Sequence, residues 1–496
     1  MKPEENSTGG GGLREFHILV SVFAAFCVAL IWAADFVPLQ DYPMRLFVGF
    51  AAATFDSPAY NWSEFFELRN SYGSFTFTFW FLRIFEPWFG IEAAGRIFLS
   101  FYILLTAVFV FVESRNRQNV PWGLLLLFPL AFNQTYMLGL MGYFISVPIL
   151  MLGLRHFNSV LEKPLTPRAA ASHLPFQAVI FLCHPLTSAV YAGFTGVICL
   201  FKSGWAFLRG IFLAGGFFLF FVTWYFLSAG SGGVDIAPRW WPLESTVQFF
   251  LLMFSGMKLT NGPDWAAVGL WCAVGIFLAY AAWRMRGKTR FSTLDLTLLA
   301  IAALGFFAFP FSPAAPFTYF NIRLVAIVYF LIAVVLSNIP MCRFAGRIFA
   351  VLVAAVLLWQ AGLQLKLSGE IAEIQPVLER MEKNSTILPV VENGKSAHID
   401  PSYFYQFHEH VPEYYHSVVG GGASPYLMNP AFPIWYRSRL DMREVLGRPN
   451  WKDYACCYKY VLARGDRFEK QDSLGPFRMV ARSGKWSLYE AEGKQF

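Results

Sequence analysis

A succession of long apolar runs constrains the fold of this chain more than any other feature of its sequence. A helix of about 20 apolar residues crosses a lipid bilayer, and it satisfies its own backbone hydrogen bonds within the lipid. Short stretches that contain Arg or Lys separate the runs. We therefore expect an α-helical polytopic membrane protein with about eleven transmembrane helices, over residues 17–36, 96–113, 121–133, 138–154, 174–183, 185–201, 209–228, 265–283, 294–311, 317–338 and 347–365.

The small share of charged residues agrees with a membrane protein and argues against a soluble one. Charged residues make up 14% of the chain and hydrophobic residues 56%, whereas about 25% of a typical soluble domain is charged. The net charge of +7 comes from clusters between the apolar runs. We expect membrane lipid around the helices and no nucleic-acid partner.

The basic clusters predict the orientation of the chain, because short cytoplasmic loops carry an excess of Lys and Arg. All five clusters become cytoplasmic if the N-terminus is cytoplasmic, the C-terminal region is extracytoplasmic and residues 37–95 form an outer loop. Within that loop, residues 75–89 would lie in the interface, because Arg83, Glu86 and Pro87 do not suit a full span. The clusters are Arg115 with Arg117, 155–168, 202–209, 284–290, and Arg343 with Arg347.

The chain divides into three parts by composition. Residues 1–16 are polar and Gly-rich, and we expect a disordered cytoplasmic N-terminus. Residues 17–365 form the transmembrane domain, in which a second outer loop, 229–264, has an apolar stretch suited to an interfacial lid or anchor. Residues 366–496 predict a small extracytoplasmic α/β domain, with an amphipathic helix at 370–382 and strands at 386–391, 416–419, 460–463, 477–480 and 486–489.

Two pairs of short helices predict chain reversals at the outer face. The apolar run 174–201 is broken by Cys183-His184-Pro185, and proline opposes helix continuation. The pair 121–133 and 138–154 turns at residues 133–136 in the same way. His184 is therefore expected at the outer face.

Two carboxylates, Asp35 and Asp41, lie where the first apolar run enters the outer loop. A carboxylate in surroundings of low dielectric is a stronger base than in water, so either could deprotonate a hydroxyl. Asp41 could equally cap the helix that follows it, because Asp is a common helix N-cap.

This order of features resembles the C-type (GT-C) membrane glycosyltransferases. The first span is followed by a long outer loop with Asp41-Tyr42-Pro43, then an interfacial helix and an Ala93-Ala94-Gly95-Arg96 entry to the second span. The resemblance implies an enzyme of the bacterial cytoplasmic (inner) membrane that passes a sugar from a polyprenyl-phosphate donor to a hydroxyl of a glycan, lipid or protein acceptor on the outer side. A carboxylate of the first outer loop is the usual base in that family, which points to Asp41 and secondly to Asp35.

The resemblance also assigns a role to basic residues near the outer face. Arg323 and Arg96 open two spans, where guanidinium groups need partners, and a lipid phosphate would supply one. Each could instead extend to water or pair with a structural carboxylate. His184 is either a phosphate ligand or a structural residue. Arg45 stands where many members carry a His, and we include it among the phosphate-binding candidates.

No acidic pair or other cluster in the sequence indicates a metal, so we expect no cofactor and a direct, inverting displacement. Asp41 would take the proton of the acceptor hydroxyl while the arginines hold the leaving phosphate. A transporter or flippase of a lipid or small solute is the alternative, since charges within spans and broken helices occur there too. A non-catalytic scaffold is a third. The long outer loop and the outer domain favour an enzyme.

Overall fold

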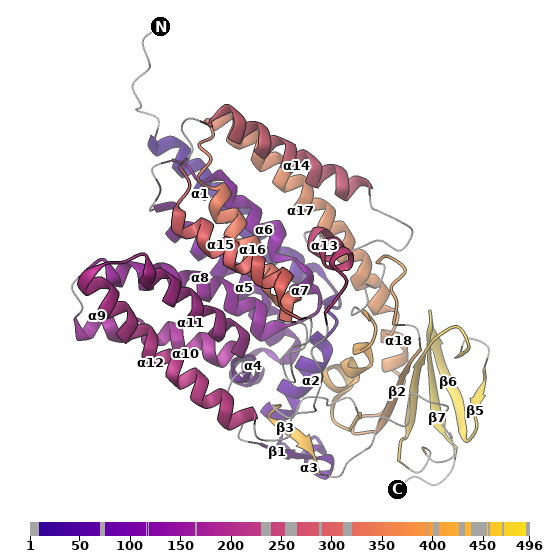
Figure 1. The fold of residues 1–496 in the computed structure, drawn as a ribbon. Coiled ribbons are helices and arrows are strands. Elements are labelled where there is room, and N and C mark those ends of the chain that lie inside the picture. The colour runs from indigo at the N-terminus through magenta and orange to yellow at the C-terminus, as the bar shows by residue number, and fades with distance from the viewer. Residues whose placement is uncertain are drawn as a thin grey trace.

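The computed structural model describes a body of apolar helices with a β-sheet unit beyond one of its ends (Figure 1). It describes residues 9–69, 75–115, 117, 119–163, 166–229, 240–252, 265–286, 290–310, 320–392, 394–399, 406–425, 432–437, 454, 457–468 and 471–492. The helical body contains α1 (Gly9–Ala33), α2 (Tyr42–Ala53), α3 (Trp62–Phe65), α4 (Thr76–Phe89), α5 (Ile91–Arg115), η1 (Trp122–Leu126), α6 (Leu127–Ala131), α7 (Gln134–Met137), α8 (Met141–Leu161), α9 (Pro167–Ala171), α10 (Leu174–Cys183), α11 (Pro185–Leu200), α12 (Gly204–Ala229), α13 (Leu243–Leu252), α14 (Trp265–Arg284), α15 (Thr293–Ala308), α16 (Phe320–Leu336) and α17 (Arg343–Ala372).

The long helices run back and forth between two ends of the body. At one end, Glu15 near the start of α1 pairs with Arg343 and Arg347 at the start of α17. At the other end, Arg96 near the start of α5 donates to the carbonyl of Trp32 at the end of α1, over 3.0 Å. We call these the Glu15 end and the Asp41 end, since Asp41 follows α1 by a few residues.

Each predicted apolar run contains helix, although the boundaries differ. α1 begins at Gly9, earlier than the predicted start at residue 17, so the Gly-rich stretch from Gly9 belongs to the first helix. The run 121–133 is divided into η1 and α6. Within the described residues, five helices (α1, α5, α8, α12 and α17) are long and apolar enough to cross a membrane, and α11, α14, α15 and α16 are shorter apolar helices. The number of crossings stays a prediction.

A buried ion network connects three helices near the Glu15 end. Arg155 of α8 contacts Glu113 of α5 through Nε and Asp295 of α15 through Nη1, each over 2.9 Å. Arg117 also pairs with Glu113. Both carboxylates are buried. Arg117 and Arg155, predicted as markers of orientation, therefore also bind α5, α8 and α15 together.

The predicted interfacial helix of the first outer loop is α4. It begins after Phe75, which has a positive φ of 81°, and it packs against α2 and α5. Its other face exposes large apolar side chains, at Trp80, Ile84, Trp88 and Phe89. Its position in the membrane interface stays a prediction.

The C-terminal sheet has the strand order β2-β4-β7-β6-β5 and its own small core. β2 (Ile387–Val391) runs parallel to β4 (Tyr460–Arg464), and the other neighbours are antiparallel. β5 is Ser473–Leu474, β6 is Phe477–Ser483 and β7 is Trp486–Ala491. The short helix α18 (Gln375–Leu378) lies between α17 and this sheet. The sheet confirms the strands predicted near 386–391, 460–463, 477–480 and 486–489.

The predicted strand at 416–419 is wrong. The chain there forms a short π-helix, η3 (His416–Gly420), which follows the 3-10 turn η2 (Val411–Glu413). Tyr414, Tyr415 and His416 are buried in succession, whereas a half-buried strand would bury every second residue. Of the two valines that suggested a strand, Val418 is exposed and Val419 is partly buried against the core.

The first outer loop and the C-terminal region interlock. β1 (Phe66–Leu68) of the loop pairs antiparallel with β3 (Ile434–Tyr436). Asn61 of the loop accepts a hydrogen bond from Gly422 N at 2.8 Å and donates to the carbonyl of Asn384 at 3.0 Å. The described residues of 406–437 therefore pack with the outer loop, and they also contact the five-stranded sheet, because Ile387 N of β2 donates to the carbonyl of Ala423 at 2.9 Å.

Candidate functional site

Backbone contacts with the turn before α8 fix the position of Asp41. Asp41 N donates to the carbonyl of Leu138 at 3.2 Å, and Gln40 N donates to that of Met137 at 3.0 Å. Gly139 has a φ of +71°, and a Cβ atom there would lie 2.9 Å from Asp41 N. Only glycine fits this position comfortably. The predicted turn at 133–136 leads into these residues, because α7 spans Gln134–Met137, and the end of this turn thus supports the candidate base.

The side chain of Asp41 occupies the N-cap position of α2 without capping the helix. Its backbone has φ −86° and ψ −4°, and its carboxylate accepts no cap hydrogen bond. Oδ2 lies 3.8 Å from an Nη of Arg45, and Oδ1 lies 3.7 Å from Nε2 of His410. The carboxylate is partly exposed and has two basic neighbours. Asp35 is exposed, and its carbonyl accepts from Arg96 at 2.8 Å.

The helix break predicted at 183–185 places His184 between α10 and α11, where it is buried. Nδ1 accepts a hydrogen bond from Leu186 N at 3.1 Å. In the neutral ring the hydrogen therefore lies on Nε2, which becomes a donor. Within the described residues Nε2 has no hydrogen-bond partner.

Arg45, Arg323 and His184 converge near this break. The charges of both arginines act on the His184 ring, and both arginines are largely buried. Arg45 lies against the rings of Phe79 and Phe432, at 5.9 and 5.2 Å from their centroids. Its Nε is buried and has no hydrogen-bond partner in the described part of the chain. Buried donors without acceptors are costly, so this cluster is suited to an anion.

Tyr143 of α8 joins two members of the cluster. Its hydroxyl donates to the carbonyl of Arg323, and its ring packs edge-on against His184 with 5.1 Å between centroids. A Cβ atom at Gly142 would lie 2.6 Å from the carbonyl oxygen of Cys183. The two predicted chain reversals therefore meet at the same place, with glycine permitting their close approach.

Arg96 has a different environment. Its guanidinium donates to the carbonyls of Trp32 and Asp35, at 3.0 and 2.8 Å, and so satisfies groups at the C-terminal end of α1. Arg96 thus holds α5 to the end of α1, and its predicted role as a phosphate ligand stays a prediction.

The sequence analysis did not identify Glu409 and His410, which the C-terminal region brings to Asp41. Glu409 accepts a hydrogen bond from Gln40 Nε2 at 3.2 Å. The pKa of Glu409 is raised, mainly by burial and also by the charge of Asp41. His410 and the hydrogen bond from Gln40 act in the opposite direction. The sequence did hold one signal for a functional segment here, because four of the eight histidines lie within 398–416.

Two further predictions concern a metal ion and the lid at 229–264. Among the described residues, no group of three His, Cys, Asp or Glu side chains could hold a metal ion. Of the predicted lid, α13 packs against α15 and α16, and Tyr329 donates to the carbonyl of Phe250 at 2.8 Å. Residues 230–239 and 253–264 of that loop lie outside the described residues.

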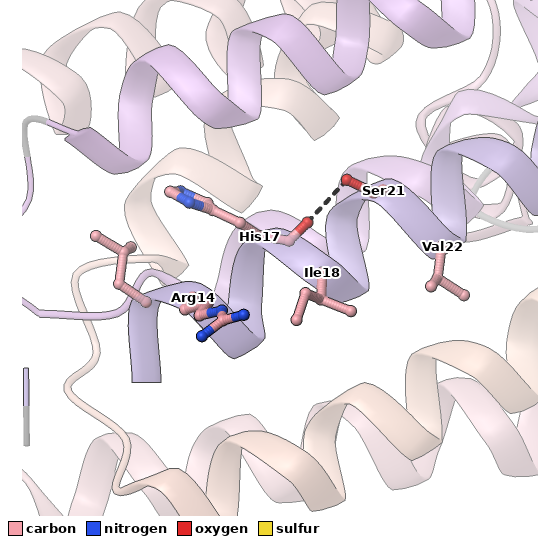
Figure 2. Close-up of a pocket in the computed structure, with 6 residues that line it drawn as sticks. Arg14, His17, Ile18, Ser21 and Val22 are labelled. Carbon is pink, nitrogen blue, oxygen red and sulfur yellow. Dashed lines mark hydrogen bonds between the residues drawn. The ribbon is translucent and has the colours of Figure 1, made fainter. Parts of the chain in front are cut away.

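A pocket of about 530 Å³ lies at the Glu15 end of α1. Figure 2 shows residues that line it. Ile18 and Val22 line it with Arg14 and His17. Ser21 Oγ donates to the carbonyl of His17 at 3.0 Å, within the helix. His17 also bonds Ser114 of α5, over 2.9 Å. This pocket is separate from the candidate site.

Comparison with known proteins gives one kind of match, which is structural. No protein-family model and no curated protein matches the sequence. The solved structure of ArnT from Cupriavidus metallidurans bound to undecaprenyl phosphate aligns with a TM-score of 0.54 and 11% identity, covering 96% of this chain and 99% of that chain. The resemblance found in the sequence is thereby confirmed for the fold. This chain has the fold of that ArnT structure, a body of apolar helices with a small C-terminal sheet domain.

Proposed function

We propose that this protein is a membrane glycosyltransferase that moves a sugar from a polyprenyl-phosphate carrier to an acceptor hydroxyl at the outer face of a bacterial cytoplasmic membrane. One observation carries the proposal: a partly exposed carboxylate, Asp41, lies beside Arg45, which forms a largely buried cationic cluster with Arg323 next to the neutral ring of His184. ArnT, which has the same fold, was solved with undecaprenyl phosphate.

The reaction is a single displacement at the anomeric carbon. Asp41 accepts the proton of the acceptor hydroxyl as its oxygen bonds to that carbon, and the bond from the carbon to the phosphate oxygen breaks. The electron pair leaves with the lipid phosphate, where Arg45, Arg323 and His184 Nε2–H stabilise the growing charge. One displacement inverts the anomeric configuration.

The apolar chain of the carrier would lie in a groove between α10 and α12. This groove has a volume of about 1030 Å³ and is lined almost wholly by apolar side chains, with Gly215 and Gly216 on α12. It extends along α10 as far as Phe181 and Leu182, which adjoin the break at His184. A carrier phosphate at the cationic cluster could therefore continue into an apolar groove.

Replacement of Asp41 tests the proposal. The full chain in nanodiscs would be given a panel of radiolabelled undecaprenyl-phosphate-linked hexoses and pentoses with glycan, lipid and protein acceptors in turn, and transfer of the label would be measured. Asp41→Asn keeps the size of the side chain but not its basicity, so transfer should fall by roughly 10²–10⁴-fold. Binding of undecaprenyl phosphate should be unchanged.

Asp56→Asn is the matched control, because Asp56 is an exposed carboxylate of the same loop, and it should leave transfer unchanged. Asp35→Asn tests the second candidate base. If both Asp41→Asn and Asp35→Asn transfer at the wild-type rate, the proposed mechanism is wrong. If the protein moves the labelled lipid across the bilayer without transferring sugar, the transporter alternative replaces it.

A further inference from the structure

The C-terminal region reaches the candidate base through fixed contacts. The side chain of Gln40 donates from Nε2 to Glu409 at 3.2 Å and accepts at Oε1 from Gln406 N at 3.1 Å. Gln40 directly precedes Asp41. Two hydrogen bonds from one side chain thus hold the chain around residues 406–409 beside Asp41.

His410 faces Asp41 from this segment. Its Nε2 lies 3.7 Å from Oδ1, and its side chain is 7% exposed. The other oxygen, Oδ2, lies 3.8 Å from Arg45. Both distances exceed the usual length of a hydrogen bond. At these distances neither nitrogen forms a hydrogen bond with the Asp41 carboxylate. Such contacts can shorten once a substrate is bound.

The charged groups around His410 come from two elements. Asp41 and Arg45 belong to the start of α2, and Glu409 is its neighbour in the chain. Glu413, one turn further on, is engaged elsewhere, because Ser424 Oγ donates to both of its oxygens, at 2.8 and 2.6 Å. His410 is thus the titratable nitrogen base closest to the Asp41 carboxylate among the described contacts.

We propose that His410 is a positioning residue that acts through Asp41 and receives the proton that Asp41 takes from the acceptor. This inference rests on the proposed glycosyltransferase function. The acceptor O–H bond breaks, its oxygen bonds to the anomeric carbon, and the phosphate leaves with the electron pair of the broken bond. The proton passes to Asp41 and then to the lone pair of His410 Nε2.

The direction of this transfer follows from ordinary acid–base chemistry. An imidazolium is a weaker acid than a carboxylic acid, with usual pKa values of about 6.5 and 3.9. Imidazole is thus in general the stronger base of the two groups, so it can take over the proton and return the carboxylate to its charged form. An imidazole that already carries a proton cannot accept another, so the rate of sugar transfer should fall on acidification if His410 has this role.

The pH dependence of transfer tests this role, using an undecaprenyl-phosphate-linked sugar that the panel shows to be a donor. His410→Gln should lower the maximal rate by about tenfold, a part of the usual general-base contribution. The acid limb of the pH–rate profile should move to lower pH in this variant, because the imidazole no longer contributes to it. His398→Gln is the matched control, because His398 is a partly exposed histidine of the same region, and it should keep the wild-type profile.

A purely structural role would not move the acid limb. Thermal unfolding and binding of undecaprenyl phosphate would be measured for each variant, and His410→Asn would replace His410→Gln if the latter does not fold. A folded variant with the wild-type acid limb overturns the role of His410, while a large loss in Asp41→Asn would leave the proposed function standing. Wild-type transfer by Asp41→Asn would instead remove the proposed function itself.

Discussion

At the scale of single residues, Asp41 illustrates a helix cap position used without capping. A capping side chain usually needs an extended backbone at the N-cap, whereas Asp41 has helical angles. The carboxylate is therefore directed away from the first N–H groups of α2. It remains available to a substrate, at the expense of a bond that commonly stabilises a helix.

The stability of an Asp41 variant should reflect this geometry. Loss of a capping Asp costs typically about 1 kcal/mol, but Asp41→Ala should lower the free energy of unfolding by less than about 0.5 kcal/mol, because no cap bond is lost. Ser292 provides the contrast, since its side chain accepts from Asp295 N at the start of α15. Thermal unfolding in detergent would compare Asp41→Ala with Ser292→Ala. A larger loss in Asp41→Ala would mean that Asp41 caps α2 after all.

The cationic cluster leads to a second prediction at this scale. If Arg323 and Arg45 hold a phosphate, Arg323→Ala and Arg45→Ala should each weaken binding of undecaprenyl phosphate by roughly 10–100-fold, the usual range for a buried charge-assisted contact. Lys at either position should retain part of the affinity, because it keeps the charge but not the two-pronged geometry.

Arg96→Gln is the informative comparison. Arg96 donates to carbonyls at the end of α1, so this change should lower the unfolding temperature and leave phosphate binding near the wild-type value. Binding would be followed by displacement of a fluorescent polyprenyl phosphate. Equal losses of affinity in Arg96→Gln and Arg323→Ala would return Arg96 to the phosphate site.

At the scale of helices, the buried network of Glu113, Arg155 and Asp295 leads to a third prediction. Breaking a buried ion pair leaves an uncompensated charge and costs about 3–5 kcal/mol. Glu113→Gln should therefore lower the unfolding temperature clearly. Glu162→Gln is its control, because Glu162 pairs with Lys202 over 3.4 Å at a side chain that is 60% exposed, and exposed pairs contribute about 0–1 kcal/mol. Similar unfolding temperatures for the two variants would mean that the network does not hold α5, α8 and α15 together.

The elements that could be predicted from sequence are those specified by local pattern. Apolar runs, the interfacial helix α4 and the breaks at 133–136 and 183–185 depend on hydrophobicity and on proline over short windows. Residues 416–419 could not be placed in this way, because burial against α2 overrides the strand preference of valine. Likewise Asp41, His184 and Arg323 stand out locally, whereas Glu409 meets Gln40 across 369 positions of sequence. No local pattern predicts such a contact.

At the scale of the whole molecule, the C-terminal region is part of the site. The outer loop supplies Asp41 and Arg45, the helix break supplies His184, α16 supplies Arg323, and the C-terminal region supplies His410. β1 and β3 further tie the loop to that region. The boundary at residue 365 therefore marks a change in composition. It does not bound the candidate site, which contains residues from both sides of it.

The orientation of the molecule in the membrane gives the last prediction. All site residues lie at the Asp41 end, and the C-terminal region packs against the loop at that end, so both should face outward. Single cysteines would be introduced in a cysteine-free background at Ser63 in the outer loop, Ser473 in the sheet and Ala171 in α9, all of which are exposed. A membrane-impermeant maleimide should label Ser63→Cys and Ser473→Cys in intact spheroplasts, and Ala171→Cys only after lysis. Labelling of Ala171→Cys in intact spheroplasts, with protection of the other two, would place Asp41 and the cationic cluster in the cytoplasm, where an outer-face transfer reaction could not use them.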